Sequence, residues 1–245
     1  MKFSDILKAI LQFIPYLFYL IITRPFHIYA YYFNRSIYYK ACSSGFKLFL
    51  FYLRIKPSIY GAELLPKPGR RFLIVANHQS FLDIPIMESI LPCAFIQRAV
   101  AYIPGLSWHF GKLSLIIDKK HPLSILKATR YVKQVTIEGG TPVALFPEAT
   151  RSIDGSLGDL HLGAASIAKS LNLPLLPVTI YNSREMLPKG TKYIKPGVVL
   201  VAIQPLIEEE FIKNHSAEEI NQEIKQRIQK GLDYLGQVRK EYKSQ

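Results

Sequence analysis

Between residues 72 and 204, short apolar runs alternate with stretches of helical periodicity, and this alternation is the strongest constraint on the fold. Short continuous apolar runs are typical of buried strands, and longer stretches with apolar residues three or four positions apart are typical of helices. The pattern predicts an α/β domain with a mostly buried sheet flanked by helices. The expected strands are 72–76, 94–97, 113–117, 142–146, 173–180 and 198–204, and the expected helices are 84–90, 124–138 and 163–171.

The N-terminal 56 residues form a different kind of segment, rich in Phe, Tyr, Leu and Ile. Its longest apolar run, 9–22, contains Gln12 and Pro15 and is shorter than the roughly 20 residues that span a bilayer. We therefore expect a membrane-binding hairpin of two helices, 9–22 and 25–53, that lies in one leaflet without crossing the membrane. The alternative is a helical cap that packs on the main domain.

The charge of the chain favours a membrane over a nucleic acid as its partner. The formal net charge is +13, and eight Lys or Arg against Asp5 give +7 to residues 1–60. Such a charge indicates a polyanionic partner, but basic arms that bind nucleic acid are rarely so apolar and aromatic. We predict an anionic phospholipid surface at the cytoplasmic face of the inner membrane. Cys42 and Cys93 are too few for a disulfide framework, which agrees with a reducing compartment and two buried thiols.

Pro and Gly residues cluster between residues 57 and 71 and mark the passage from the N-terminal segment, 1–56, to the main domain, 57–245. Near the end of the chain, Ser216 and Glu219 have the spacing of a capping box. Apolar residues follow at helical intervals up to Leu235. This stretch predicts a C-terminal helix that docks on the core.

The sequence NHQSFLD, residues 77–83, follows the apolar run FLIVA directly, so His78 is expected in the turn after a strand. Open α/β sheets place their sites in such turns. His78 and Asp83 would not meet within one helix, because five residues separate them by roughly 140° around its axis. They can meet if Ser80 caps a helix that begins after His78 and holds Asp83 in its first turn.

This pairing of His78 and Asp83 predicts a general base. An Asp that binds one imidazole nitrogen fixes the tautomer and leaves the other nitrogen free to take a proton. A substrate hydroxyl would then take the place of an enzyme serine and attack a thioester directly. The competing interpretation is structural, since Ser80 and Asp83 also have the spacing of a capping box.

A second polar stretch, FPEATRS at 146–152, follows the expected strand PVALF. Arg151 can hold a phosphate with two parallel hydrogen bonds, and Glu148 can orient the loop or a ligand hydroxyl. The competing interpretation is an ion pair on the surface. The stretch IIDKKH, 116–121, also ends a strand, and its two lysines offer further phosphate contacts or form a solvated face.

These stretches and LPLLPV, 173–178, occur in the order and approximate spacing of the four sequence blocks of glycerolipid acyltransferases. The chain resembles this family over about residues 60–205, and within it the 1-acylglycerol-3-phosphate O-acyltransferases. The N-terminal segment is similar to the membrane-binding element of bacterial members. The resemblance implies an α/β acyltransferase domain that uses thioesters of acyl carrier protein or coenzyme A, without a metal or a bound cofactor.

The resemblance also implies roles for individual residues. His78 is expected to be the base and Asp83 its orienting partner. Lys119 stands where the second block usually has Arg, and Ala149 replaces the usual Gly of the third block, which matters if the loop requires a positive φ. The expected substrate-binding residues are Glu148, Thr150, Arg151, Asp118 and Lys119.

The predicted reaction is transfer of a fatty acyl chain to the sn-2 hydroxyl of lysophosphatidic acid, which gives phosphatidic acid. Three alternatives stay open: the same chemistry on another lysophospholipid or a lyso-aminolipid, hydrolysis of the thioester, and a membrane lipid-binding protein without catalysis. Motifs of other enzyme classes are missing from the sequence. It has no Walker A loop, no G-x-S-x-G elbow of serine hydrolases and no H-E-x-x-H zinc site.

Overall fold

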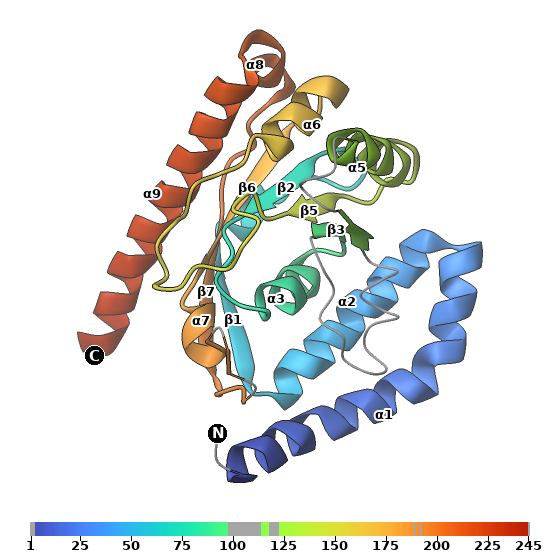
Figure 1. Ribbon diagram of the computed structural model, residues 1–245, viewed down its shortest axis with the longest axis vertical. Helices are drawn as coiled ribbons and strands as arrows, with labels where there is room; N and C mark the ends of the chain where they lie inside the picture. The colour runs from blue at the N-terminus through green and yellow to red at the C-terminus, as the bar shows by residue number, and fades with distance from the viewer. Residues whose placement is uncertain (1–2, 98–113, 118–122, 189, 192, 245) are drawn as a thin grey trace.

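The computed structural model describes residues 3–97, 114–117, 123–188, 190, 191 and 193–244. Their centre is a seven-stranded sheet in the order β1-β7-β6-β2-β5-β3-β4 (Figure 1). Neighbouring strands are parallel except for β6 and β7, which pair antiparallel. The strands are β1 (Ile55–Tyr60), β2 (Leu73–Ala76), β3 (Ala94–Gln97), β4 (Ser114–Ile116), β5 (Val143–Leu145), β6 (Leu175–Tyr181) and β7 (Gly197–Ile203).

The sheet confirms the predicted fold class, and all six expected strands lie close to their predicted bounds. The residues of β2 and β5 are all buried, which explains why continuous apolar runs marked these strands. The strand β1 was not predicted, because Pro57 belongs to the Pro- and Gly-rich stretch 57–71 that was expected to be a connection. Most residues of β1 are only partly buried or exposed, so no continuous apolar run marks it. β1 lies at the edge of the sheet, where a Pro without an N–H donor is tolerated.

Helices occupy the three stretches predicted within the main domain. They are α3 (Asp83–Ile90), α5 (Ser124–Val132), which continues as a π-helix over Lys133–Glu138, and α6 (Gly163–Leu171). Two short helices, α7 (Ser183–Met186) and α8 (Glu209–Asn214), and a 3₁₀ turn (Ala62–Leu64) were not predicted. Elements this short display too few apolar positions for a helical period to be recognised.

The C-terminal helix α9 (Ala217–Ser244) confirms the prediction from the capping box. Ser216 N donates to Glu219 Oε2 at 2.7 Å, and Glu219 N donates to Ser216 Oγ at 3.2 Å. The helix packs along β6, and α6 lies between α9 and α5 (Figure 1). Ile220, Ile224 and Ile228 are fully buried, so the apolar stripe of α9 closes one side of the core.

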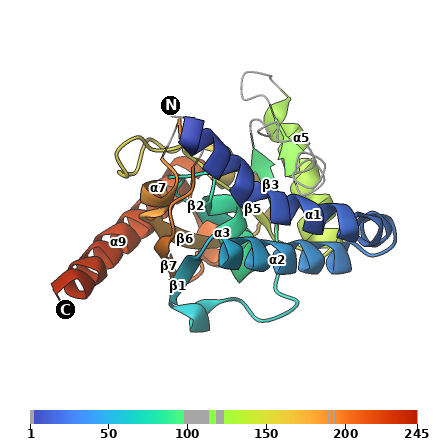
Figure 2. The ribbon, with the colours of Figure 1, turned by 90° about the horizontal axis from the view of Figure 1, so that it is seen from below.

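The N-terminal segment forms α1 (Phe3–Phe33) and α2 (Arg35–Tyr52), which pack on each other (Figures 1 and 2). The boundary expected between residues 22 and 25 was wrong, because α1 continues through Pro15 and Pro25. Each Pro removes one backbone hydrogen bond and favours a kink, and α1 curves along its course (Figure 1). The break lies at Asn34, whose extended backbone and side-chain bond from Ile37 N at 3.1 Å cap α2.

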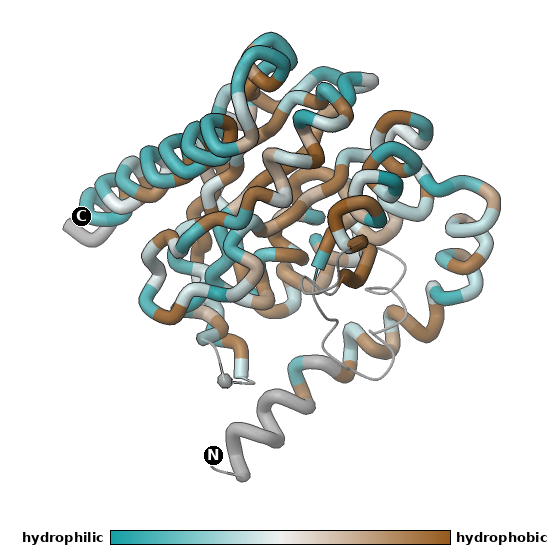
Figure 3. The backbone as a smooth tube through the Cα atoms, turned by 45° about the horizontal axis from the view of Figure 1, so that its top comes forward, coloured by the Kyte–Doolittle hydropathy of each residue, from teal (hydrophilic) through white to brown (hydrophobic). Residues whose placement is uncertain are grey.

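The two N-terminal helices differ in what they bury. α2 packs on α3 and buries Tyr38, Phe46 and Leu50, and both cysteines are buried and free, as predicted. None of the helices in the described ranges is long and apolar enough to cross a membrane. From Leu11 onward, apolar residues recur along α1 (Figure 3). Among the side chains described there, the large apolar ones that are exposed are Leu11, Ile14, Phe18, Ile21, Ile22, Phe26, Ile28, Tyr29, Tyr32 and Phe33.

Candidate active site

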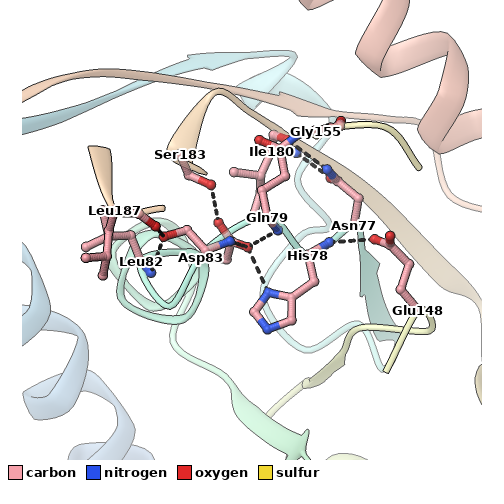
Figure 4. A network of polar contacts seen from close by, with 11 residues as sticks. Asn77, His78, Gln79, Leu82, Asp83, Glu148, Gly155, Ile180, Ser183 and Leu187 are labelled. Atoms are coloured by element: carbon pink, nitrogen blue, oxygen red, sulfur yellow. Dashed lines mark hydrogen bonds and ion pairs between the residues drawn. The ribbon is translucent and has the colours of Figure 1, made fainter. Parts of the chain in front are cut away.

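Three parallel strands end at the same edge of the sheet and bring the polar stretches of the sequence together. β2 ends at Ala76, directly before NHQSFLD, and its neighbours β5 and β6 end before FPEATRS and α7. The carboxyl ends of parallel strands are where open α/β sheets form their sites. Side chains from these three connections meet in one network of polar contacts (Figure 4).

The centre of this network is the carboxylate of Asp83, which is fully buried. Asp83 Oδ2 lies 2.8 Å from His78 Nδ1, so the contact predicted between these side chains is present. The same oxygen accepts the backbone N–H groups of Gln79 at 2.6 Å and Ser80 at 2.8 Å. Asp83 Oδ1 accepts the hydroxyl of Ser183 at 2.5 Å (Figure 4). Four donors therefore compensate the burial of this carboxylate.

Ser80 does not cap the helix in the manner expected from the sequence. α3 begins at Asp83, and the Ser80 hydroxyl donates to Leu187 O at 2.9 Å and accepts from Leu82 N at 3.3 Å. Only half of a capping box is formed, in which the Asp83 carboxylate reaches back to Ser80 N. His78 still precedes the helix and Asp83 still lies in its first turn, so the geometry that lets them meet was predicted correctly.

The imidazole of His78 is fixed on its face as well as at its edge. Its ring stacks on Phe146, with centroids 4.1 Å apart and planes inclined by 14°. A proton on Nδ1 can be donated to Asp83, which leaves the lone pair on Nε2. Nε2 points away from Asp83 (Figure 4) and has no hydrogen-bond partner among the described residues. The side chain of His78 is partly exposed, at 15%.

Glu148 fastens the two strand-end loops to each other. Its Oε1 accepts His78 N at 2.7 Å and its Oε2 accepts Gly158 N at 2.9 Å, while Ser152 N donates to His78 O at 2.7 Å. Burial raises the pKa of the Glu148 carboxyl, and the bonds from His78 and Gly158 oppose that shift. Of the two roles considered for Glu148, orientation of the loop fits these contacts.

Arg151 lies beside NHQSFLD through an aromatic contact. Its guanidinium carbon is 3.8 Å from the centroid of the Phe81 ring. Burial lowers the pKa of Arg151, and the charge of Asp83 opposes that shift. The surface ion pair considered as an alternative is not formed, because Arg151 has no carboxylate partner within the described ranges and Glu148 binds backbone donors. Thr150, exposed and next to Arg151, completes the loop.

Ala149 stands where Gly is usual, a replacement that was expected to matter if the loop requires a positive φ, and the residue does adopt a positive φ. Its φ is 53°, in the left-handed region where a Cβ is disfavoured and Gly is at ease. The loop therefore holds a strained residue between Glu148 and Arg151. Asp118 and Lys119, the remaining residues expected at the substrate site, lie outside the described residues.

The network also contains residues that the sequence did not single out. Asn77 extends the pairing of β2 and β6 with its side chain, which donates to Ile180 O at 2.8 Å and accepts from Ile180 N at 2.7 Å. Gln79 Nε2 donates to Gly155 O at 3.1 Å. Asn77 and Gln79 flank His78, which was a signal for them, whereas Ser183 had only its place after an expected strand. In the described part of the chain, no three His, Cys, Asp or Glu residues are grouped to hold a metal.

Comparisons with known proteins found similar sequences in one family. A family model described as Acyltransferase matches residues 56–181. A 1-acyl-sn-glycerol-3-phosphate acyltransferase of Chlamydomonas reinhardtii is 33% identical over 152 residues, which cover 60% of this chain and 46% of that protein. One from Pseudomonas aeruginosa is 27% identical, over 69% of this chain and 65% of the relative. The matched stretches thus span less than two thirds of either relative.

The fold has a counterpart among solved structures. The crystal structure of a 1-acyl-sn-glycerophosphate acyltransferase from Thermotoga maritima superposes with a TM-score of 0.77 at 24% identity. The match covers 95% of this chain and 96% of that one, so it includes the N-terminal helices as well as the sheet.

Proposed function

Since the chain belongs to the acyltransferase family, as its four sequence blocks predicted, we propose that it acylates the sn-2 hydroxyl of lysophosphatidic acid, giving phosphatidic acid. The observation that carries the proposal is the 2.8 Å bond between His78 Nδ1 and the buried carboxylate of Asp83, with Nε2 directed away from it. The names of the relatives support lysophosphatidic acid as the acceptor.

In this mechanism His78 and Asp83 act as a catalytic dyad without an enzyme nucleophile. Asp83 holds the proton on Nδ1, and Nε2 takes the proton of the acceptor hydroxyl. The hydroxyl oxygen attacks the thioester carbonyl, the C–S bond breaks, and the protonated imidazole returns its proton to the leaving thiolate. General base catalysis of this kind contributes about 10²–10⁴ to the rate.

Arg151 supplies the positive charge for the phosphate of the acceptor. Its guanidinium is held against Phe81 and is not neutralised by a carboxylate among the described residues, so its donors are available to an anion. Thr150, Asp118 and Lys119 complete the headgroup site in this proposal. Glu148 acts indirectly, because its oxygens hold the loops that carry His78 and Arg151.

The acyl donor in this proposal is a thioester of acyl carrier protein or coenzyme A. A thiolate leaves readily from a thioester carbonyl. The proposed catalysis therefore uses proton transfer and positioning, without a metal or a bound cofactor. The two donors differ in what they present to the surface of the protein, a protein carrier or a nucleotide, while the reacting thioester is the same.

The proposed site of action is the cytoplasmic face of the inner membrane, with α1 lying in the lipid interface. The exposed apolar residues of α1 recur three or four positions apart, which is the spacing of one helix face. The cations Arg24, Lys40 and Lys47 are exposed on the same pair of helices and can meet anionic headgroups. α2 fits the alternative of a helical cap, because it packs on α3. The two readings of the segment thus apply to different helices.

The test is an assay of the purified protein with several lysophospholipid acceptors and with both classes of thioester. We expect phosphatidic acid from lysophosphatidic acid, and a rate lowered about 10³-fold or more in His78→Ala. Equal product from wild type and His78→Ala on every acceptor would overturn the enzymatic role. Accumulation of free fatty acid alone would identify a hydrolase, and preference for another headgroup would correct the acceptor.

A further inference from the structure

We propose that Ser183 is a positioning residue for the dyad, acting through the carboxylate of Asp83. The inference rests on the proposed function, because it assigns Ser183 a part in the general base catalysis of His78. It adds a side chain from the connection after β6 to a site otherwise built from the connections after β2 and β5.

The contact itself is short and buried. Ser183 Oγ donates to Asp83 Oδ1 at 2.5 Å, and neither residue is exposed to solvent. The other carboxylate oxygen, Oδ2, receives His78 Nδ1 and two backbone N–H groups. Ser183 is thus the donor to Oδ1 within the described ranges. Together with the backbone donors to Oδ2, its hydroxyl fixes the rotation of the carboxylate that turns Oδ2 toward His78.

The backbone turn directly before Ser183 determines where its hydroxyl lies. Asn182 has a φ of 64°, a left-handed conformation that Asn tolerates and that turns the chain sharply after β6. Its side chain holds the turn on β7, donating to Val198 O at 2.8 Å and accepting from Leu200 N at 3.2 Å. The position of Ser183 is therefore set by the sheet.

The residues after Ser183 are tied to both loops of the site. Arg184 Nε donates to Ile153 O at 2.7 Å in the loop after β5. Leu187 O accepts the hydroxyl of Ser80, in the loop after β2, at 2.9 Å. Together with the bond from Ser183, these contacts hold α7 against both loops. A change at Ser183 therefore alters the contacts that orient His78.

A role in orientation makes a different prediction from a role in stability alone. Without the Ser183 hydroxyl, a buried carboxylate oxygen has no partner, and the carboxylate can rotate away from its alignment with Nδ1. The neutral imidazole then populates both tautomers, and the one with a proton on Nε2 cannot accept the substrate proton. If the Ser183 side chain only stabilised the fold, its removal would lower the melting temperature and leave the tautomer of His78 unchanged.

The experiment compares Ser183→Ala with Ser43→Ala. Ser43 is also buried and its hydroxyl also donates to α3, to Glu88 O at 2.7 Å, but it does not contact the carboxylate of Asp83. We expect Ser183→Ala to lower kcat about 10- to 100-fold, with KM values changed less than about threefold. Ser43→Ala should keep kcat within about threefold, and Ser183→Thr, which retains the hydroxyl, should recover most of the lost rate.

A second readout does not depend on which substrate is used. The ¹⁵N chemical shifts of the His78 ring should report a proton on Nδ1 in wild type and Ser43→Ala, and a mixture of tautomers in Ser183→Ala. If folded Ser183→Ala keeps the wild-type tautomer and kcat, the inference is wrong. Folded Ser183→Thr with the rate of Ser183→Ala would also overturn it. Absence of acyl transfer in wild type would overturn the proposed function, while the ring shifts would still decide the role of Ser183.

Discussion

Glu148 joins the loop of His78 to the loop of Arg151, because each of its carboxylate oxygens accepts one backbone N–H. Glu148→Gln would turn an NH₂ group toward one of these donors and leave it without a partner. Such a loss weakens the hold on the loop of His78 by about 1–3 kcal/mol, which corresponds to about 5- to 150-fold in rate, so we expect kcat for acyl transfer to fall within this range. Glu63→Gln, at an exposed position, is the control. A wild-type kcat in Glu148→Gln would show that the loops are held by other contacts.

Ala149 offers a substitution that should stabilise the protein. A non-Gly residue in the left-handed region destabilises the folded state by about 1–2 kcal/mol, and Gly removes this strain. Gly also makes the unfolded chain more flexible, which offsets about 0.5–1 kcal/mol of the gain. We expect Ala149→Gly to raise the free energy of unfolding by about 0.5–1 kcal/mol, measured by urea denaturation. Ala41→Gly, inside α2, should change it in the opposite direction. A destabilised Ala149→Gly would contradict the strain inferred from φ.

Glu88 should make stability depend on pH. It is fully buried, Oε2 accepts Cys93 N at 2.8 Å, and Oε1 is buried without a partner in the described structure. Burial raises the pKa of this carboxyl well above its ordinary value, and the bond from Cys93 opposes the shift. The folded chain therefore keeps a proton that the unfolded chain loses.

The sign of this dependence follows from proton linkage. Its contribution is fully present below the pKa of the unfolded carboxyl and is lost as pH rises toward the raised pKa of the folded one, by up to about 1.4 kcal/mol per pH unit. We expect the free energy of unfolding of the wild-type protein to fall in this way between about pH 5 and 8, and that of Glu88→Gln not to do so, measured by urea denaturation. The same slope in both proteins would show that other groups cause it.

The sequence predicted the contact of His78 with Asp83 because the two residues share one strand-to-helix connection. The partners of Glu148 were not predictable, since its acceptors bind backbone N–H groups that carry no signal of residue type. Ser183 was missed for a related reason. It lies 100 residues from Asp83, and only the register of β6 beside β2 brings the two together.

At the scale of elements, burial decided which predictions succeeded. The strands β2, β5 and β6 are buried on both faces and were recognised as continuous apolar runs. The edge strand β1 has a mixed pattern and was read as a connection. The limits of α1 were misplaced because Pro25 was taken as a helix start, whereas Asn34 provides the actual cap for α2.

The exposed face of α1 is the element on which membrane binding should depend. Phe18 and Ile22 are one turn apart and more than half exposed, so replacing both with Ser removes apolar area without opening the core. We expect this double variant to bind anionic phospholipid vesicles at least about tenfold more weakly, since burying each side chain contributes about 1.5–3 kcal/mol. Cosedimentation with vesicles measures the effect.

The matched control lies on α9, on the side of the molecule away from α1 (Figure 1). Tyr234 is a large, exposed side chain on that helix, and Tyr234→Ser should leave vesicle binding within about twofold of wild type. Equal loss in the two variants would mean that α1 is not the binding face. An unchanged affinity of the α1 variant would mean that charge alone holds the protein at the surface.

At the scale of the whole molecule, the strand order converts distant sequence blocks into one site. β2 lies between β5 and β6 and is parallel to both, so the connections after these strands emerge at one edge. Blocks separated by scores of residues thus need no direct sequence signal to meet. The prediction of an α/β sheet was sufficient to place His78 near Arg151, but not to give the distances that decide their roles.

The charge of the whole molecule should govern how acyl transfer responds to salt. The net charge is +13, and residues 1–60, which include α1 and α2, carry +7 of it. Each basic residue near an anionic surface contributes about 1 kcal/mol, and salt shortens the screening length from about 10 Å at 0.1 M to about 3 Å at 1 M. Between these concentrations we expect acyl transfer on anionic vesicles to fall about tenfold or more, and acyl transfer in neutral detergent micelles to change less than about twofold. Measured initial rates that fall equally in vesicles and micelles would place the salt effect on phosphate binding by Arg151 instead of on the membrane.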